Sequence, residues 1–323
     1  MDLRTMKYFL VAAEEKNFSR AAERLYISQQ ALSNHIRRME LQYNIVLFER
    51  KPMLRLTLAG ERMVFYAKQL LATEAAMLSN FADISDNCKG KLTIGISRLR
   101  SRVFFPDIWN AYNSKFPNIS IVLRDGVTNI FEELLETGEL DFYIGVDVPA
   151  TPTICSLPLA HEGKYCIFHE NLIRQYYPAS WKNFLEDSKG GISLREIKDL
   201  PFIMLAPGNR LRSSLDYFFS SNGVLPHVLL ETNNQHLACQ IAMEGGGLAV
   251  LSPIVFYNLA RTSNFKTDSH VHIRPITDFS DSLVTLDYRS NLQLPHYAHA
   301  LIGAVKDTFD LYNQTLEEAL QKF

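Results

Sequence analysis

A long stretch without helix-breaking residues places the strongest constraint on the fold of this chain. From about Leu58 to Cys88 there is no proline, and the one glycine, Gly60, lies at the start, so a single long helix is predicted. Apolar residues recur along it every seven positions at Met63, Leu70, Met77 and Ile84, with Ala67 and Phe81 at the second seam position and Val64, Leu71 and Leu78 beside them. A long helix must bury such a stripe, and pairing with a second copy of the chain is the natural route. Packing on its own domain is the alternative.

The predicted helix separates two segments of different size and charge. At 323 residues the chain is longer than one ordinary core, so two or three domains are expected. Residues 1–60 contain ten Lys and Arg against six Asp and Glu, a charge of +4, whereas the remainder carries −6. A basic head on an acidic body is typical of a nucleic-acid-binding domain, although many solvated protein surfaces show the same bias.

The first 45 residues have the pattern of a helix-turn-helix. Apolar residues between Leu3 and Glu15 fall at helical spacing. Ser19 is the predicted N-cap of a second helix, and Ser28 is the predicted N-cap of a third helix that ends near Tyr43. Two short helices joined by a tight turn match the helix-turn-helix layout.

The third helix divides into a buried stripe and a polar face. Leu32, Ile36 and Met39 share the stripe, while the polar face and its N-terminus hold Ser28, Gln29, Gln30, Ser33, Asn34 and Arg37, with Arg38 beside them. Gln and Asn can pair with adenine, Arg can pair with guanine, and the helix N-terminus favours a phosphate. An ordinary solvated face is the alternative, but the run from Ser28 to Met39 contains no acid. The pattern therefore indicates a helix that binds DNA.

The segment after this helix, IVLFERKPMLRLT, contains two short β-prone runs around Lys51 and Pro52. These runs predict a hairpin wing. Arg50, Lys51 and Arg55 would place positive charge on the wing, suited to phosphates or a minor groove. A basic hairpin without a DNA-binding role is the alternative.

Taken together, these segments resemble the DNA-binding head of the LysR-type transcriptional regulators. The matching elements are FSRAAERL, ISQ-ALS--IRRME, LFER and LT-AG, in the order and spacing of the family. The family often has proline where Gln30 stands and S-R-Q-I where this chain has Ser33, Asn34, His35 and Ile36. Both departures should change which operator is bound. The resemblance also implies that the long helix is the linker that pairs two subunits, through Met63, Ala67, Leu70, Leu71, Met77, Leu78 and Phe81.

The remainder of the chain has the pattern of an α/β domain. The apolar runs KLTIGIS, ISIVLRDG and LDFYIGV alternate with helical stretches, which predicts βαβ units and a parallel sheet. This part resembles the two-lobed effector domain of the family, which is similar to periplasmic binding proteins. We therefore expect a winged helix-turn-helix at 1–58, a linker helix at 59–89 and an effector domain at 90–323. Its first lobe would comprise about 91–161 and 268–323, and its second about 162–267. A long segment near 169–191 is interpreted as a helical insertion.

Ligands of open α/β sheets bind beyond the carboxyl ends of the strands. In this chain those positions predict an effector site that includes Ser97, Arg98, Leu99, Arg100, Thr128, Val146, Leu205 and Asn209. The resemblance implies that Leu99, Thr128 and Val146 match pocket positions of the family, although Leu99 replaces its usual Ser or Thr. Arg98, Arg100 and Arg102 predict an anion site, since arginine pairs well with carboxylates. Surface arginines or a subunit contact are the alternative.

The sequence contains none of the motifs that would indicate an enzyme, a dinucleotide site or a zinc site. No cofactor and no metal are therefore expected. There is no run of about 20 apolar residues, so no membrane contact is expected, and the start MDLRTMKYFL lacks a signal-peptide layout, which predicts a cytoplasmic protein. The four cysteines are scattered, and a redox switch that uses Cys155 and Cys166 is an open alternative to inert thiols.

The sequence thus predicts a transcriptional regulator whose operator binding responds to a small-molecule effector between two lobes. Its expected partners are double-stranded DNA, that effector, further copies of the chain in a homodimer or homotetramer, and RNA polymerase if it is an activator. A solute-binding protein without a regulatory role is the remaining alternative, and the basic head argues against it.

Overall fold

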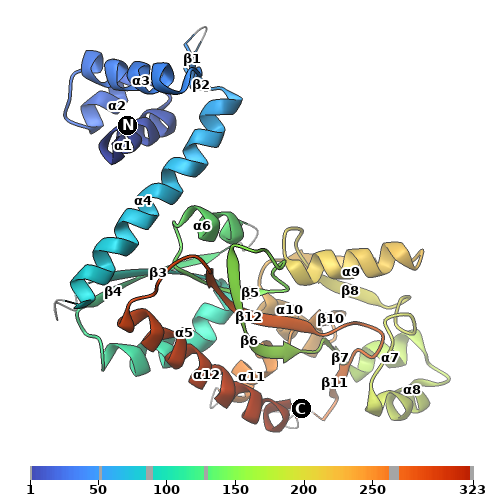
Figure 1. The fold of residues 1–323 in the computed structure, drawn as a ribbon. Coiled ribbons are helices and arrows are strands. Elements are labelled where there is room, and N and C mark those ends of the chain that lie inside the picture. The colour runs from blue at the N-terminus through green and yellow to red at the C-terminus, as the bar shows by residue number, and fades with distance from the viewer. Residues whose placement is uncertain (1, 51–52, 85–89, 127–129, 262–268, 321–323) are drawn as a thin grey trace.

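The computed structural model describes residues 2–50, 53–84, 90–126, 130–261 and 269–320. A small helical head stands at one end of a long helix, and the other end of that helix lies against a larger two-lobed body (Figure 1). Lys51, Cys88 and Thr128 lie outside the described residues.

The head contains the helices α1 (Leu3–Glu15), α2 (Phe18–Arg24) and α3 (Gln29–Tyr43). Its core gathers Phe9, Leu32, Ile36 and Phe48, all of them buried. The cap of α2 was predicted wrongly, because the helix begins at Phe18, two residues before the predicted start at Arg20. Its N-cap is Asn17, whose side chain accepts hydrogen bonds from the amides of Ser19 and Arg20.

The predicted wing is present as the antiparallel strands β1 (Phe48–Glu49) and β2 (Arg55–Leu56). The linker helix α4 (Leu58–Ile84) starts directly after it. Gly60 is required at this junction, because a Cβ there would overlap the carbonyl oxygen of Leu47. The wing therefore fits tightly against the first turn of the linker.

The apolar stripe of α4 is divided between the head and solvent. Ala67 is fully buried in the core of the head, and Met63 and Leu71 pack against that core. All three were expected to face a second copy of the chain. The structure corrects this for Ala67, whose side chain is fully buried within its own chain, whereas Met63 and Leu71 remain partly exposed. The other predicted seam residues remain exposed, namely Leu70, Met77, Leu78 and Phe81.

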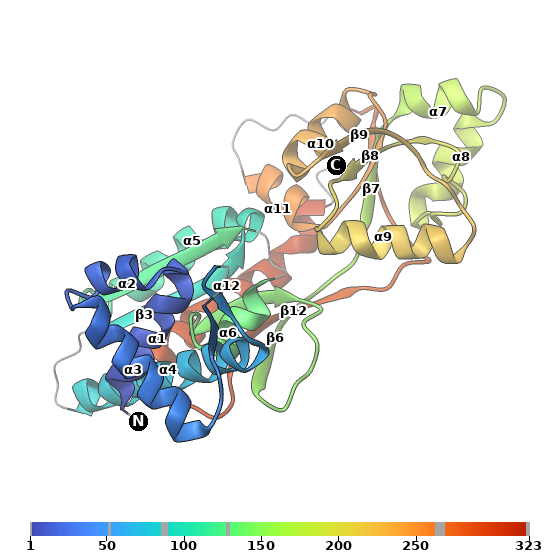
Figure 2. The same ribbon diagram turned by 90° about the horizontal axis from the view of Figure 1, so that it is seen from above.

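The first lobe contains a sheet in the order β4-β3-β5-β12-β6. Its strands are β3 (Gly90–Ser97), β4 (Ile119–Gly126), β5 (Phe142–Val146), β6 (Ile154–Glu162) and β12 (Ser282–Arg289). β3 runs parallel to β4 and β5, as the sequence predicts, whereas β12 is antiparallel to β5 and β6. Helices α5 (Arg98–Asn113), α6 (Phe131–Thr137) and α12 (His296–Leu320) pack around it (Figures 1 and 2).

The second lobe contains a sheet in the order β11-β7-β10-β8-β9. Its strands are β7 (Tyr165–His169), β8 (Pro201–Leu205), β9 (His227–Thr232), β10 (Leu248–Leu251) and β11 (Val271–Pro275). β11 pairs with β7 of this lobe, so the segment 271–275, expected in the first lobe, belongs to the second. The chain thus crosses between the lobes after β6 and again between β11 and β12.

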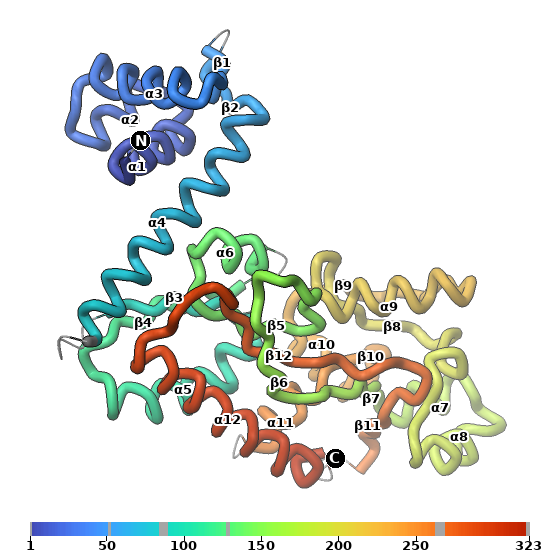
Figure 3. Tube along the Cα trace, viewed as in Figure 1, coloured from blue at the N-terminus to red at the C-terminus, as the bar shows by residue number. Residues whose placement is uncertain are grey.

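The helices of the second lobe are α9 (Arg210–Ser221), α10 (Gln235–Met243) and α11 (Ile254–Arg261), together with the expected insertion. The insertion forms α7 (Glu170–Tyr176), α8 (Trp181–Asp187) and the short 3₁₀ turn η2 (Ser188–Gly190). Tyr177, Trp181 and Phe184 pack on the core of the lobe, so the insertion covers the end of that core (Figure 3).

Candidate DNA-binding surface and effector cleft

The recognition helix α3 presents its polar face to solvent. Gln29, Gln30, Asn34, Arg37 and Arg38 are exposed, and Ser33 is half-buried. Ser28 is the N-cap, and its hydroxyl accepts the amide of Ala31 at 3.1 Å, so the side chain is already occupied. The stripe predicted to be buried is buried, with Leu32, Ile36 and Met39 at most 1% exposed.

The basic residues of the head differ in how freely they can meet DNA. Arg20 and Arg24 form ion pairs with Glu15, and Arg24 also pairs with Glu14. Arg37 and Arg38 have no acidic partner at ion-pair distance among the described residues. These two arginines therefore keep their charge available for a phosphate or a base.

Glu40 connects the recognition helix to the wing. Its carboxylate accepts the backbone amides of Leu47 at 2.8 Å and Phe48 at 3.3 Å. The same carboxylate pairs with Arg50 at 3.3 Å, and the guanidinium of Arg50 lies 5.8 Å from the centre of the Phe18 ring. Arg50 is thus partly neutralised, while Arg55 is exposed in β2.

A cleft of about 630 Å³ lies between the two lobes. The N-termini of three helices line it, namely α5 at Ser97, α9 at Asn209 and α10 at Asn234. Each of these residues caps its helix by accepting backbone amide hydrogen bonds with its side chain. Ser97 accepts the amide of Arg100, and Asn209 accepts the amide of Leu211. Asn234 accepts the amides of His236 and Leu237. Aligned peptide dipoles make such helix ends favourable for a negative charge.

Buried charges form the floor of this cleft. Glu162 is 1% exposed, forms an ion pair with the buried Arg100, and accepts the hydroxyl of Tyr312 at 3.2 Å. Arg100 therefore has its charge satisfied inside the protein. Arg100 was expected to form an anion site together with Arg98 and Arg102. Its ion pair with Glu162 means that it does not belong to a free cluster of this kind.

Lys164 is the second buried cation of the cleft. It is 4% exposed, and its ammonium donates to the carbonyl of Glu162 at 3.0 Å and to the hydroxyl of Ser282 at 2.8 Å. The Ser282 hydroxyl in turn donates to Asp147 at 2.7 Å. Burial lowers the pKa of Lys164, so the charged form is costly where it stands. An anion at this position would offset that cost.

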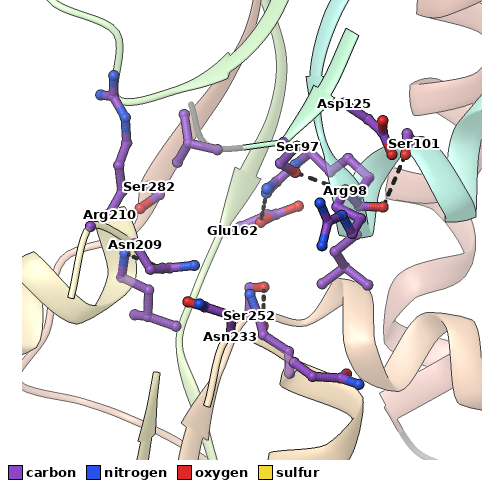
Figure 4. Close-up of a pocket in the computed structure, with 18 of the residues that line it drawn as sticks. Ser97, Arg98, Ser101, Asp125, Glu162, Asn209, Arg210, Asn233, Ser252 and Ser282 are labelled. Carbon is purple, nitrogen blue, oxygen red and sulfur yellow. Dashed lines mark hydrogen bonds and ion pairs between the residues drawn. The ribbon is translucent and has the colours of Figure 1, made fainter. Parts of the chain in front are cut away.

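Three further cations line the cleft, namely Arg98, Arg102 and Arg210. Figure 4 shows Arg98 and Ser101 on one side and Asn209 and Arg210 on the other, with Glu162 between them. Arg98 and Arg102 are exposed. His236 has a lowered pKa because of burial and, secondarily, because of the charge of Arg102. The lining of the cleft contains five Lys and Arg residues against three Asp and Glu residues, so its charge is positive in sum.

Comparison with known proteins identifies the two parts of the chain. Residues 3–61 match the bacterial regulatory helix-turn-helix proteins of the lysR family, and residues 86–310 match the LysR substrate binding domain. The chain belongs to the LysR family. It is therefore a DNA-binding transcriptional regulator with an effector domain, and this family is one of regulators rather than enzymes.

Several relatives of the LysR family cover most of the chain. The HTH-type transcriptional regulator CfxR of Cupriavidus necator is 25% identical over 253 residues, which are 78% of this chain and 76% of CfxR. The hydrogen peroxide-inducible genes activator of Haemophilus influenzae is 27% identical over 251 residues, 76% of this chain and 78% of that protein.

Solved LysR-family structures have the same fold. A full-length OxyR variant from Pseudomonas aeruginosa superposes with a TM-score of 0.66 at 22% identity and covers 95% of this chain and 98% of its own. Full-length CbnR complexed with its target DNA gives a TM-score of 0.58 at 18% identity, covering 95% of this chain and 100% of CbnR.

Most of the predicted effector residues line the cleft. Ser97, Arg98, Leu99, Arg100, Val146 and Asn209 do so. Leu205 does not, because it ends β8 with its side chain in the core of the second lobe, where it is 2% exposed. Lys164 and Ser282 were not predicted, since only the two segments that cross between the lobes bring them to this place.

The cysteines of this LysR-family chain are separated by the fold. Cys155 lies in β6 of the first lobe and Cys166 in β7 of the second. Cys166 is fully buried, and burial raises the pKa of its thiol to about 12. Among the described residues, no group of His, Cys, Asp and Glu could hold a metal ion, and no helix is long and apolar enough to cross a membrane.

Proposed function

We propose that this LysR-type regulator binds a small anionic effector in the cleft between its lobes. The observation that carries the proposal is that three helix N-termini line the same cleft as the buried Lys164 ammonium. Arg98 and Arg102 would draw the anion toward the opening, and Asn209 and Val146 would contact its body. An effector of this kind acts only if it favours one arrangement of the lobes over the other.

We further propose how the protein meets DNA. Gln29, Gln30, Ser33, Asn34 and Arg37 would contact base edges, while Arg38, Arg50, Lys51 and Arg55 would contact phosphates. The exposed residues Leu70, Met77, Leu78 and Phe81 of α4 would pair two subunits, so that two heads bind two half-sites. The division at 58 and 89 into head, linker and effector domain underlies this arrangement. The protein would act in the cytoplasm, and would contact RNA polymerase if it activates.

Two measurements test this function separately. Purified protein should shift a DNA fragment from upstream of its own gene at low salt, and failure to shift any such fragment would contradict operator binding there. A panel of small mono- and dicarboxylates should include at least one that raises the melting temperature, since a ligand that binds only the folded state stabilises it. If no anion in the panel stabilises the protein, the anionic effector is wrong.

A redox-sensing regulator is the second candidate. It is supported by similarity to the hydrogen peroxide-inducible genes activator of Haemophilus influenzae and to the OxyR fold. A sensor cysteine must expose a thiolate. Cys166 is buried with a raised pKa, whereas Cys155 is partly exposed, so Cys155 would have to react first.

A further inference from the structure

Helix α6 contacts the linker helix and also Arg210, a residue that lines the cleft. It contains only seven residues, Phe131–Thr137, and it ends at Gly138, whose amide bonds back to Leu135 at 3.1 Å. The amide of Glu139 also bonds back, to Leu134 at 2.8 Å. These two hydrogen bonds close the C-terminus of the helix. Figures 1 and 2 both show it beside α4.

At the cleft, α6 is joined to the opposite lobe by an ion pair. Arg210, the first residue of α9 in the second lobe, pairs with Glu132 in the first turn of α6. The same guanidinium donates to the backbone carbonyl of Asp147 in the first lobe at 2.8 Å. Arg210 lines the cleft, and its side chain is 30% exposed, so an anion in the cleft can reach it.

At its other end, α6 and the turn that follows it are joined to the linker helix. The ammonium of Lys68 lies 2.6 Å from the carboxylate of Glu139, and the side-chain amide of Gln69 donates to the carbonyl of Glu136 at 3.1 Å. Between these contacts Gly138 approaches α4 so closely that a Cβ would overlap Ala72. A shift of α6 therefore cannot occur without a response from α4.

The linker helix is in turn fixed to the head. Ala67, one residue before Lys68, is fully buried in the core of the head. Lys7 of α1 pairs with Glu74 of α4 at 3.1 Å. The contacts to α6 and the contacts to the head thus interleave along the same two turns of α4, so the head follows the linker at this point.

We propose that α6 transmits a change in the cleft to the DNA-binding head, and that the Arg210–Glu132 ion pair is the contact that changes. The proposal rests on the proposed function, because an anionic effector is what would compete with Glu132 for Arg210. Withdrawal of Arg210 would free α6 from the second lobe, and α4 would then adopt a different position. Only an effector that binds the two arrangements unequally shifts their populations.

The test uses the full-length protein without any effector, so it does not depend on finding one. Glu132→Gln keeps the shape of the side chain and removes the charge that holds Arg210. Hydrogen exchange is then measured by mass spectrometry in peptides that cover α6 and residues 63–75 of α4. We expect the rate of amide hydrogen exchange in both segments to rise by about threefold. This is the size expected from the loss of a partly exposed ion pair.

The matched control breaks another ion pair between the lobes. Arg261 of α11 pairs with Asp107 of α5 at 3.0 Å, and neither residue belongs to α6 or α4. Arg261→Gln should leave exchange in residues 63–75 at the wild-type rate. If it quickens exchange there as much as Glu132→Gln does, the effect is general loosening of the lobes and the proposal is overturned.

A double variant with the two charges exchanged shows whether the effect of Glu132→Gln comes from the lost ion pair or from partial unfolding. Combining Glu132→Arg with Arg210→Glu restores the opposite charges, and it should return exchange in α4 toward the wild-type rate. The proposal would be overturned if Glu132→Gln speeds exchange in α6 but not in α4. It would also be overturned if exchange in α4 stays fast in the double variant. A carboxylate panel that stabilises nothing would instead count against the effector and leave this result unaffected.

Discussion

Gly138, the C-cap of α6, lies directly against Ala72 of α4, so closely that a Cβ on Gly138 would overlap the Cβ of Ala72. Gly138 also has a φ of 79°, in the left-handed region that favours glycine. The contact between the effector domain and the linker thus depends on a residue without a side chain. Two independent requirements, backbone conformation and space, meet at this one position.

Gly138→Ala should therefore weaken both the fold and the linker contact. The left-handed conformation costs roughly 1–2 kcal/mol for a residue with a Cβ, and the overlap with Ala72 should bring the loss in the free energy of unfolding to about 2–3 kcal/mol. Urea denaturation measures it. Gly223→Ala is the matched control, because Gly223 has a φ of 64° and open space around it. Equal losses of unfolding free energy in Gly138→Ala and Gly223→Ala would show that the contact with Ala72 of α4 adds no cost.

The head gives a prediction about operator choice. Gln30 is exposed on the recognition helix, so Gln30→Ala should change relative affinities among operator sequences by about 5- to 150-fold, the range of one bidentate base contact. Arg50→Gln should instead weaken binding to all sequences and lower the salt slope by about one. Fluorescence anisotropy on a set of operator variants separates the two effects. Unchanged relative affinities in Gln30→Ala would refute its role in base recognition.

The fold of the head and the linker could be predicted from sequence because their signals are local. The stripe of Leu32, Ile36 and Met39 and the cap at Ser28 lie within one helix, and both were confirmed. What the apolar stripe of α4 packs against could be predicted only in part. A seven-residue repeat identifies an apolar face but not its partner, and the structure assigns Ala67 to the head while Leu70 stays exposed.

The cleft was predicted only in part, for a physical reason. Ser97 and Asn209 could be placed there because Ser97 is the last residue of β3 and Asn209 lies just beyond the end of β8. Lys164 could not, because its role depends on Ser282, which is 118 residues further along the chain. The ion pair between Arg210 and Glu132 likewise joins residues 78 positions apart. Contacts of this length are fixed by tertiary folding and leave no local pattern.

Lys164 should be the residue on which stabilisation by anions depends. In Lys164→Met, the rise in melting temperature produced by a carboxylate that stabilises the wild type should disappear. Lys189→Met is the control, because Lys189 is exposed on η2 and pairs with Glu186. If the carboxylate stabilises both variants to the same extent, Lys164 does not bind the anion.

The same residue predicts a pH dependence. Burial lowers the pKa of Lys164 in the folded state below its ordinary value, so the ammonium loses its proton at a lower pH than in the unfolded chain. Stabilisation by the anion needs the charged form, and should therefore fade below the pH at which an ordinary lysine loses its proton, about 10.4. A thermal-shift series in which the anion effect stays constant up to that pH would contradict this.

Asp287 predicts a second pH dependence, in this case of the stability of the fold, because its pKa is raised and not lowered. It is fully buried in β12, and burial raises the pKa of its carboxyl. Between its unfolded and folded pKa values the folded state keeps a proton that the unfolded state has lost, so the free energy of unfolding falls as pH rises through that window. Asp287→Asn can still accept the Thr285 hydroxyl. It should be more stable than the wild type at pH 7 and lose this advantage at acid pH. Denaturant titrations at several pH values compare the two proteins.

The cysteines allow the redox candidate to be tested directly. Burial raises the pKa of both Cys166 and Cys239 to about 12, so neither thiol is ionised near neutral pH. Since the thiolate is the reactive species, both should resist a thiol reagent in the native protein and react only after unfolding. Mass spectrometry of the labelled peptides assigns each site. If Cys166 is labelled quickly in the native state, its burial does not protect it.

A redox sensor would have to begin at Cys155, because that thiol is partly exposed. Cys155→Ser should then abolish any change in operator binding that peroxide causes, whereas Cys239→Ser, at a site buried in the second lobe, should not. Because Cys155 and Cys166 lie in strands of different lobes, a bond between them would require the lobes to rearrange. An unchanged peroxide response in both Cys155→Ser and Cys166→Ser would rule out a switch built on these cysteines and leave effector binding in the cleft as the control of this regulator.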